Sequence, residues 1–328
     1  MKTPKIVSLF IVVFLLISVS GYAATPAGVT VLKFAHVNGP DHPYQLAATK
    51  FAQLISERTN GKVTVETFHS GQLGNERELI EQCKLGSVDF VVTASAPWGN
   101  FMPELMVFDL PFLFRDRAHA YKVLDGPIGK SYLQKMDKQN VVGLAFWDNG
   151  FRHVSNSKRE VKTPADLKGL KIRLMENPVH LGTFKALGAM PTPMAWGEVF
   201  TALQQKTIDG MENSPVVYVT SNLFEVQKYL SLTGHFYSPA PFIMNKDKMN
   251  KLPKDIQAII LKTSIEMRDY ERKVHLELDE KNLKVLKDKG MTITTVDTNL
   301  FREKCTALYD EYKTKLGANT INNIINTK

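Results

Sequence analysis

Arg173 is the residue of this sequence best suited to hold a small anion. It lies in the apolar run 171–174 (KIRL), which is typical of a buried strand. A guanidinium in a partly dry environment needs a partner, because an unpaired buried charge is costly. Its flat fork of donors matches both oxygens of a carboxylate, which a lysine ammonium cannot do. From the residue alone, a structural salt bridge is the simpler interpretation and a ligand clamp is the alternative.

Two further polar side chains follow or begin predicted elements. Asn213 comes two residues after the strand-like segment 207–211, and ligands of open α/β sheets bind at the carboxyl ends of strands. Its amide both donates and accepts, which suits a carboxylate or a hydroxyl. Glu76 lies in the first turn of a predicted helix, where it either interacts with the helix end or accepts hydrogen bonds from ligand hydroxyls.

Motifs for catalysis are missing from the sequence. No glycine-rich nucleotide loop follows a strand, and neither GxSxG nor HExxH occurs. Cys83 shares a predicted helix face with Leu79 and Ile80, which favours a core thiol over a nucleophile. His36 and His42 could bind a metal, but no third ligand stands at a diagnostic spacing, so a loop or pocket lining is the simpler interpretation. We therefore expect a binding protein with no catalytic residue, cofactor or metal.

The elements that would position these side chains alternate between strands and helices. Strand-like segments are expected at 31–35, 63–67, 89–93, 141–147, 171–174 and 207–211. Helices are expected between them, and the charged segment 252–286 indicates long surface helices. Asn75 and Glu78 predict a capping box at the start of one helix. Repeated strand–helix units argue for α/β domains with largely parallel sheets.

The amino terminus indicates export. Lys2 and Lys5 precede an apolar run at 6–19, and small residues at Gly21 and Ala23 follow. That run is too short to cross a bilayer core of about 30 Å. We therefore predict a signal peptide at 1–23, cleaved after Ala23, and a mature protein that is soluble in the periplasm of a Gram-negative bacterium.

Composition supports a globular binding protein rather than a nucleic-acid binder. The 328 residues are 44% hydrophobic, which is ordinary for a chain of two or three domains. The formal charge is +8, but the basic residues are scattered among acidic ones, so we expect no nucleic-acid partner. With only Cys83 and Cys305, no zinc cluster or disulfide framework can form, and a single bridge between them stays possible.

Five segments carry a resemblance to a known family. They are GQLGNERELIEQCKLGSVDF (71–90), DLPFLFRDRAHAYKVLDG (109–126), WDNGFRHVSNSKREVKTPADLKGLKIR (147–173), PTPMAWGEVFTALQQKTIDGMEN (191–213) and FEVQKYLSLTGHFYSP (224–239). In this order they resemble the DctP-type solute-binding proteins of TRAP (tripartite ATP-independent periplasmic) transporters. The resemblance implies an α/β, two-lobed periplasmic-binding-protein (Venus-flytrap) fold with long C-terminal helices. It places lobe one at 24–149 plus 239–278 and lobe two at 150–238 plus 279–328.

The resemblance also implies a function, which is not that of an enzyme. The protein would capture a small organic acid and deliver it to the small and large membrane subunits of a TRAP permease, and we expect a monomer. Sialic-acid-binding relatives are similar to one another in carrying charged residues where this chain has Ala94 and Pro97, which argues against sialic acid. Sugar acids such as hexuronates or keto-gulonates are favoured, C4-dicarboxylates are the alternative, and other hydroxy acids come third. A sensor or binding module that feeds no permease, and an exported enzyme acting on an acid, stay open.

Site residues follow from the same resemblance. It assigns Arg173 as the clamp on the ligand carboxylate and Arg152 as a second carboxylate-facing arginine. Two such arginines would repel each other until an anion arrives, which would favour closure. Trp196 is similar to an aromatic residue that lines the pocket of relatives, with helix core as the alternative. Trp98 and His36 come from lobe-one loops that should face the cleft.

Overall fold

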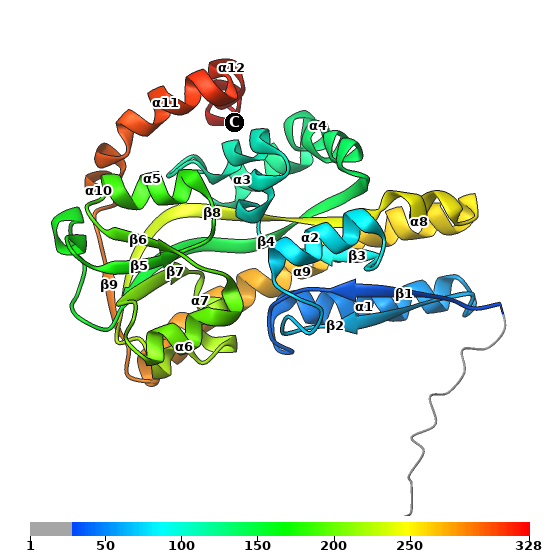
Figure 1. The fold of residues 1–328 in the computed structure, drawn as a ribbon, viewed down its shortest axis with the longest axis horizontal. Coiled ribbons are helices and arrows are strands. Elements are labelled where there is room, and N and C mark those ends of the chain that lie inside the picture. Colours follow the sequence, from blue (N-terminus) through cyan, green and yellow to red (C-terminus); the bar gives the residue numbers. More distant parts are fainter. Residues whose placement is uncertain (1–27) are drawn as a thin grey trace, which may run out of the picture.

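The computed structural model describes residues 28–328, so the predicted signal peptide lies outside the described residues. Within this part of the chain, nine strands form one mixed sheet with helices packed around it (Figure 1). The strands lie in the order β2-β1-β3-β8-β4-β7-β5-β6, and β9 pairs with β8. The predicted α/β class is confirmed.

The elements have the following bounds. The strands are β1 Thr30–Ala35, β2 Val63–Phe68, β3 Phe90–Val92, β4 Val141–Asn156, β5 Lys171–Leu174, β6 Met190–Pro193, β7 Gly210–Asn213, β8 Tyr229–Asn245 and β9 Thr292–Thr295. The helices are α1 Pro43–Arg58, α2 Glu76–Leu85, α3 Arg117–Asp125, α4 Pro127–Lys135, α5 Pro178–Ala186, α6 Val199–Gln204, α7 Pro215–Thr220, α8 Lys246–Lys251, α9 Lys254–Asp288, α10 Thr298–Lys304, α11 Thr306–Leu316 and α12 Ala318–Ile325. Each predicted strand overlaps an observed one, but 141–147 is only the first part of β4.

The sheet is parallel at its two ends and antiparallel in its centre. Strand β1 pairs in parallel with β2 and β3, and β5 pairs in parallel with β6 and β7. In the centre, β8 is antiparallel to β3 and β4, and β4 is antiparallel to β7. The expectation of largely parallel sheets is therefore wrong for the centre. Local strand–helix–strand patterns predict the outer strands, whereas β4 and β8 pair across a long stretch of sequence.

Three elements run through the expected lobe boundaries. The boundary at 149/150 falls inside β4, the one at 238/239 falls inside β8, and the one at 278/279 falls inside α9. The β4–β8 register shifts between Asp148 and Phe151 and again between Arg152 and Val154. Such bulges bend and twist a strand pair locally. The chain therefore runs through each expected boundary on a continuous element, and two of these elements are irregular there.

Each half has an apolar core of its own. In lobe one, Phe34 stacks on Phe242 at a ring-centroid distance of 5.0 Å and meets Phe51 edge-on, beneath helices α1 and α9. In lobe two, Ile172 and Phe184 belong to a separate buried cluster. Burying a phenylalanine side chain contributes about 1.5–3 kcal/mol, so each cluster stabilises the elements that pack around it.

Helix α2 begins and ends as local chemistry dictates. The Asn75 side chain accepts from the Glu78 amide, and the Glu78 carboxylate accepts from the Asn75 amide. The predicted capping box is present. Gly86 ends the helix at φ 83°, a conformation that glycine adopts without steric cost. The helix start fixes Glu76, its first residue, at a defined position.

The C-terminal helices pack against segments that were expected in lobe one. Tyr312, Ile321 and Ile324 of α11 and α12 join a buried cluster made mostly of lobe-one residues. Arg115 also donates to the carbonyl of Ile325 at 2.8 Å. The end of the chain therefore packs on lobe one, although 279–328 was expected in lobe two.

Both cysteines are buried and free, and they lie in separate apolar clusters, Cys83 with lobe one and Cys305 with lobe two. No bridge joins them. Across residues 28–328, none of the helices combines the length and the apolar character that crossing a bilayer requires.

Candidate functional site

A cleft between the two expected lobes brings most of the predicted residues together. It consists of an outer hollow of about 300 Å³ and an inner hollow of about 310 Å³, which share Glu76, Arg173, Met175 and Trp196. The two hollows are lined by Val37, Asn38, Tyr44, Asn75, Glu76, Arg77, Ala94, Pro97, Asn149, Arg152, Arg173, Met175, Glu176, Met194, Ala195, Trp196 and Asn213.

Arg173 enters the cleft from β5. Its side chain is buried, and its Nε and Nη2 atoms donate to the Met194 carbonyl at 2.9 and 2.6 Å. Among residues 28–328 it forms no ion pair with a carboxylate. Burial lowers the pKa of Arg173 to about 10, so the guanidinium remains charged at neutral pH. The cleft therefore contains a fixed cation that no carboxylate of residues 28–328 contacts directly.

Arg152 is equally buried but is already paired. Its Nε and Nη2 atoms donate to the two carboxylate oxygens of Glu212 at 2.5 and 2.9 Å, and Nη1 donates to Asn213 Oδ1 at 2.8 Å. Burial would lower the pKa of Arg152, but the attraction of Glu212 outweighs it and raises the pKa. Glu212 therefore already pairs with Arg152 in the protein, although Arg152 still acts to lower the pKa of Arg173.

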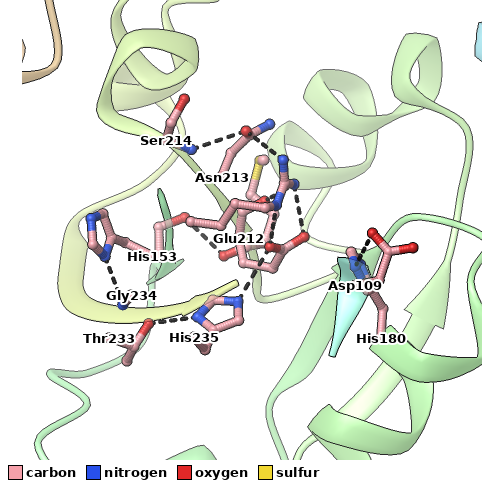
Figure 2. Close-up of polar contacts among 12 residues, drawn as sticks. Asp109, His153, His180, Glu212, Asn213, Ser214, Thr233, Gly234 and His235 are labelled. Atoms are coloured by element: carbon pink, nitrogen blue, oxygen red, sulfur yellow. Dashed lines mark hydrogen bonds and ion pairs between the residues drawn. The ribbon is translucent and has the colours of Figure 1, made fainter. Parts of the chain in front are cut away.

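Glu212 is the residue that sequence reasoning missed. It lies on β7 and is fully buried (Figure 2). Burial would raise the pKa of Glu212, but Arg152 and His235 hold it well below its ordinary value. His235 Nε2 lies 3.3 Å from Glu212 Oε2, and its Nδ1 lies 2.7 Å from Thr233 Oγ1. An acidic residue inside a short buried strand signals a buried ion pair, but the sequence does not say with which cation.

Asn213 ends β7, so its predicted place at a strand end is confirmed. Its Oδ1 accepts from Arg152 and from the Ser214 amide at 2.9 Å (Figure 2). The amide oxygen is thereby occupied, and the Nδ2 donors are left for a ligand. The side chain is 5% exposed and lines the inner hollow.

Glu76 and Trp196 line both hollows. The Oε1 atom of Glu76 accepts from the Ala94 amide at 2.9 Å. Burial raises the pKa of Glu76, while this amide and the charge of Arg173 act to lower it. Trp196 lies in a 3₁₀ turn, with its ring centroid 5.8 Å from Arg173 Cζ. It is half-buried and packs against two apolar clusters.

Trp98 and His36 do not reach the cleft, and these two predictions are corrected. Trp98 is fully buried in the lobe-one core, where its Nε1 donates to Thr93 Oγ1 at 3.1 Å. His36 is fully buried, and its Nε2 lies 2.9 Å from Gln45 Oε1. Burial lowers the pKa of His36 to about 4. The adjacent residues Val37 and Pro97 do line the cleft, so each segment faces it through a neighbouring side chain.

Metal ligands do not converge in the described part of the chain. Among residues 28–328, no three His, Cys, Asp or Glu side chains group as a metal site would require. His42, which the sequence offered as a candidate ligand, caps helix α1 by accepting from the Tyr44 amide.

Comparisons with known proteins agree with this geometry. The pattern of DctP, bacterial extracellular solute-binding protein family 7, matches residues 34–315. A solute-binding protein of Verminephrobacter eiseniae is 46% identical over 82% of this chain and 81% of its own length. The 2,3-diketo-L-gulonate-binding periplasmic protein YiaO of Escherichia coli is 38% identical over 83% of each chain.

Solved structures show the same likeness. A TRAP periplasmic solute-binding protein from Polaromonas sp. JS666 bound to D-erythronate has a TM-score of 0.89 and 41% identity, covering 91% of this chain and 99% of that one. The sugar acid binding protein DctPAm of Advenella mimigardefordensis, in complex with galactonate, has a TM-score of 0.89 and 36% identity, covering 91% and 97%. A protein from Sulfurospirillum deleyianum with bound succinate has a TM-score of 0.88 and 34% identity, covering 91% and 99%.

Proposed function

The chain belongs to family 7 of the bacterial extracellular solute-binding proteins, and we propose that it captures a sugar acid in the periplasm and delivers it to a TRAP permease. Its relatives and structural neighbours are substrate-binding proteins rather than enzymes. The E. coli relative is named for 2,3-diketo-L-gulonate, and two neighbours hold D-erythronate and galactonate. These ligands share one carboxylate and several oxygen substituents.

Arg173 carries the proposal. It is a buried, charged guanidinium that faces a cleft and has no carboxylate partner among the described residues. A ligand carboxylate would supply that partner in a poorly hydrated site, where a charge-assisted hydrogen bond is strong. The Nδ2 donors of Asn213 and the ring of Trp196 border the same space.

Closure of the two lobes is the proposed response to the ligand. The cleft is lined from one side by residues such as Glu76 and Ala94 and from the other by Arg173 and Asn213, so a ligand there contacts both halves. A ligand shifts the open–closed equilibrium only if it binds the closed form better, and contacts to both sides provide that difference. We place the hinge where β4, β8 and α9 cross.

C4-dicarboxylates are the second candidate ligand class. One observation favours them: the S. deleyianum neighbour holds succinate. The same arginine would serve for either class, so the two classes differ only in what lies beyond the shared carboxylate.

Thermal unfolding of the purified protein against a panel of organic acids tests the proposal. At a concentration of about 100 times its Kd, the true ligand stabilises the folded protein by about 2.7 kcal/mol, which a melting curve resolves. We expect a sugar acid to do so in the wild type. In Arg173→Ala the affinity should fall by roughly 30-fold or more, because truncating one partner of a buried charge pair costs about 2–5 kcal/mol.

Arg173→Lys is the matched variant, because it keeps the charge and removes the fork. We expect it to bind more weakly than the wild type, with unfolding in the absence of ligand unchanged. An Arg173→Ala protein that binds the acid normally would show that the clamp lies elsewhere. A wild type stabilised by no acid of the panel would contradict the proposed function itself.

A further inference from the structure

Two polar groups in the inner hollow have no partner in the protein. The hydroxyl of Tyr44 and the amide oxygen of Asn149 are both buried, and neither makes a hydrogen bond with any described residue. Tyr44 is 2% exposed and Asn149 is 6% exposed, and both line the inner hollow beside Arg173 and Asn213. Buried polar groups in folded proteins are almost always hydrogen-bonded, so two orphans facing one hollow indicate that a ligand completes them.

The surrounding structure holds both side chains in place. Tyr44 lies in the first turn of α1, and its ring packs edge-on against His42 and Trp147, with centroid distances of 4.5 and 5.9 Å. Asn149 lies in β4 at the bulge between Asp148 and Phe151, where the strand departs from regular pairing with β8. A bulge turns a side chain away from its regular direction. Neither group therefore needs to be ordered when a ligand arrives, which lowers the entropic cost of binding.

The two groups lie across the cleft from the carboxylate clamp. Tyr44 and Asn149 belong to the lobe-one segments, whereas Arg173 and Asn213 belong to lobe two. A phenol hydroxyl donates and accepts, and an amide does both through its two ends. These are the partners that a hydroxyl group of a ligand requires.

The charged residues of the inner hollow favour a ligand with a single carboxylate. Of the two arginines that line the inner hollow, Arg152 is paired with Glu212, and only Arg173 has no carboxylate bonded to it among the described residues. The remaining ionisable carboxyl group of the lining is Glu76, which belongs to lobe one like the two orphans. A second ligand carboxylate would lie in a poorly hydrated space next to Glu76, without a cation of its own, and that arrangement is costly.

We propose that Tyr44 and Asn149 form a hydroxyl-binding subsite which, together with Glu76, selects polyhydroxylated monocarboxylates over dicarboxylates of similar length. This inference rests on the proposed function, since it concerns the part of the ligand that lies beyond the carboxylate held by Arg173.

Calorimetric titration with galactonate, D-glucuronate, D-erythronate and succinate tests the subsite. We expect the wild type to bind at least one of the three sugar acids more tightly than succinate. For that sugar acid, Tyr44→Phe and Asn149→Ala should each weaken binding by about tenfold, as loss of a buried hydrogen bond does. Succinate offers no hydroxyl, so its affinity should be unchanged in Tyr44→Phe. Glu76→Gln should reduce the ratio of the affinity for the sugar acid to that for succinate, because it removes the charge that opposes a second carboxylate.

Tyr237→Phe is the matched control. Tyr237 is also 2% exposed, and its hydroxyl also has no partner among the described residues, but it lines neither hollow. Its loss should leave every affinity unchanged. Melting curves without ligand show whether each variant is folded, and Tyr44→Phe is mild enough to keep the ring packing.

The possible outcomes separate the subsite from the clamp. If Tyr44→Phe and Asn149→Ala bind the sugar acid as the wild type does, while Arg173→Lys binds poorly, the subsite is wrong and the proposed function stands. A wild type that binds succinate as tightly as any sugar acid overturns the selectivity. If Arg173→Lys binds normally, the clamp is wrong whatever the other variants do. A wild type that binds none of the four acids overturns the clamp and the subsite together.

Discussion

Two buried arginines on nearby strands of one sheet differ in whether a carboxylate pairs with them. Arg152 on β4 is held by both oxygens of Glu212 and by Asn213, whereas Arg173 on β5 donates only to the backbone carbonyl of Met194. Strand β7 lies between them and provides Glu212 and Asn213. Burial alone therefore does not decide what a charge is for. The first arginine is paired within the protein and orients Asn213, and the second has no carboxylate partner among the described residues.

Removing Glu212 should have the largest effect on stability. In Glu212→Gln, Arg152 stays buried without a counter-charge, which should lower the free energy of unfolding by about 3–5 kcal/mol. Arg173→Leu should change it by less than about 1 kcal/mol in the absence of ligand, since no ion pair is lost. Urea unfolding of the two variants measures both values. Adding Arg152→Met to Glu212→Gln should recover part of the lost stability. Equal destabilisation by Glu212→Gln and Arg173→Leu would contradict the difference between the two arginines.

His36 extends the comparison of buried basic residues, because its side chain is neutral whereas the two arginines are charged. Its pKa is lowered to about 4 by burial, whereas an unfolded histidine titrates near 6.5. The unfolded chain binds more protons between these pH values, so the free energy of unfolding falls as the pH drops through this window. We expect His36 to account for a loss of about 2 kcal/mol between pH 7 and pH 5. Urea unfolding of wild type and His36→Gln at both pH values measures how much of the loss is due to His36. The same change in the free energy of unfolding between pH 7 and pH 5 in both proteins would contradict this expectation.

Arg77 should give the smallest effect. It lines the outer hollow, but its side chain is 55% exposed and its ion pair with Glu81 spans 3.4 Å at the surface. Such exposed pairs contribute about 0.2–1 kcal/mol. Arg77→Ala should change the free energy of unfolding by no more than that and the ligand affinity by less than about threefold. A large loss of affinity would mean that the anion is held at the rim and not at Arg173.

The site residues that the sequence could predict are those with a local signal. Arg173 stands out as a charge in an apolar strand, Asn213 as an amide at a strand end, and Glu76 by its place in a helix start, and all three line the cleft. The capping box of α2 was predictable for the same reason, because its partners are three residues apart.

The rest depends on contacts that no local pattern encodes. Glu212 and Arg152 are 60 positions apart, so their pairing appears only once β4 and β7 are side by side. Trp98 and His36 lie in loops that border the cleft, but the direction of each side chain is set by packing. Likewise, nothing near residue 44 or 149 in sequence indicates that these two groups face the same hollow.

The passage of β4, β8 and α9 between the halves also constrains how the molecule can be assembled. Strand β3 has β1 on one side and needs β8 on the other, so the sheet of lobe one is incomplete until residue 245 is present. Helix α1 packs against α9, which follows later still. A chain that folds as it grows from its amino terminus therefore cannot finish its first half before most of the second has been synthesised. The two halves must mature together, and neither can be produced as a stand-alone fragment of contiguous sequence.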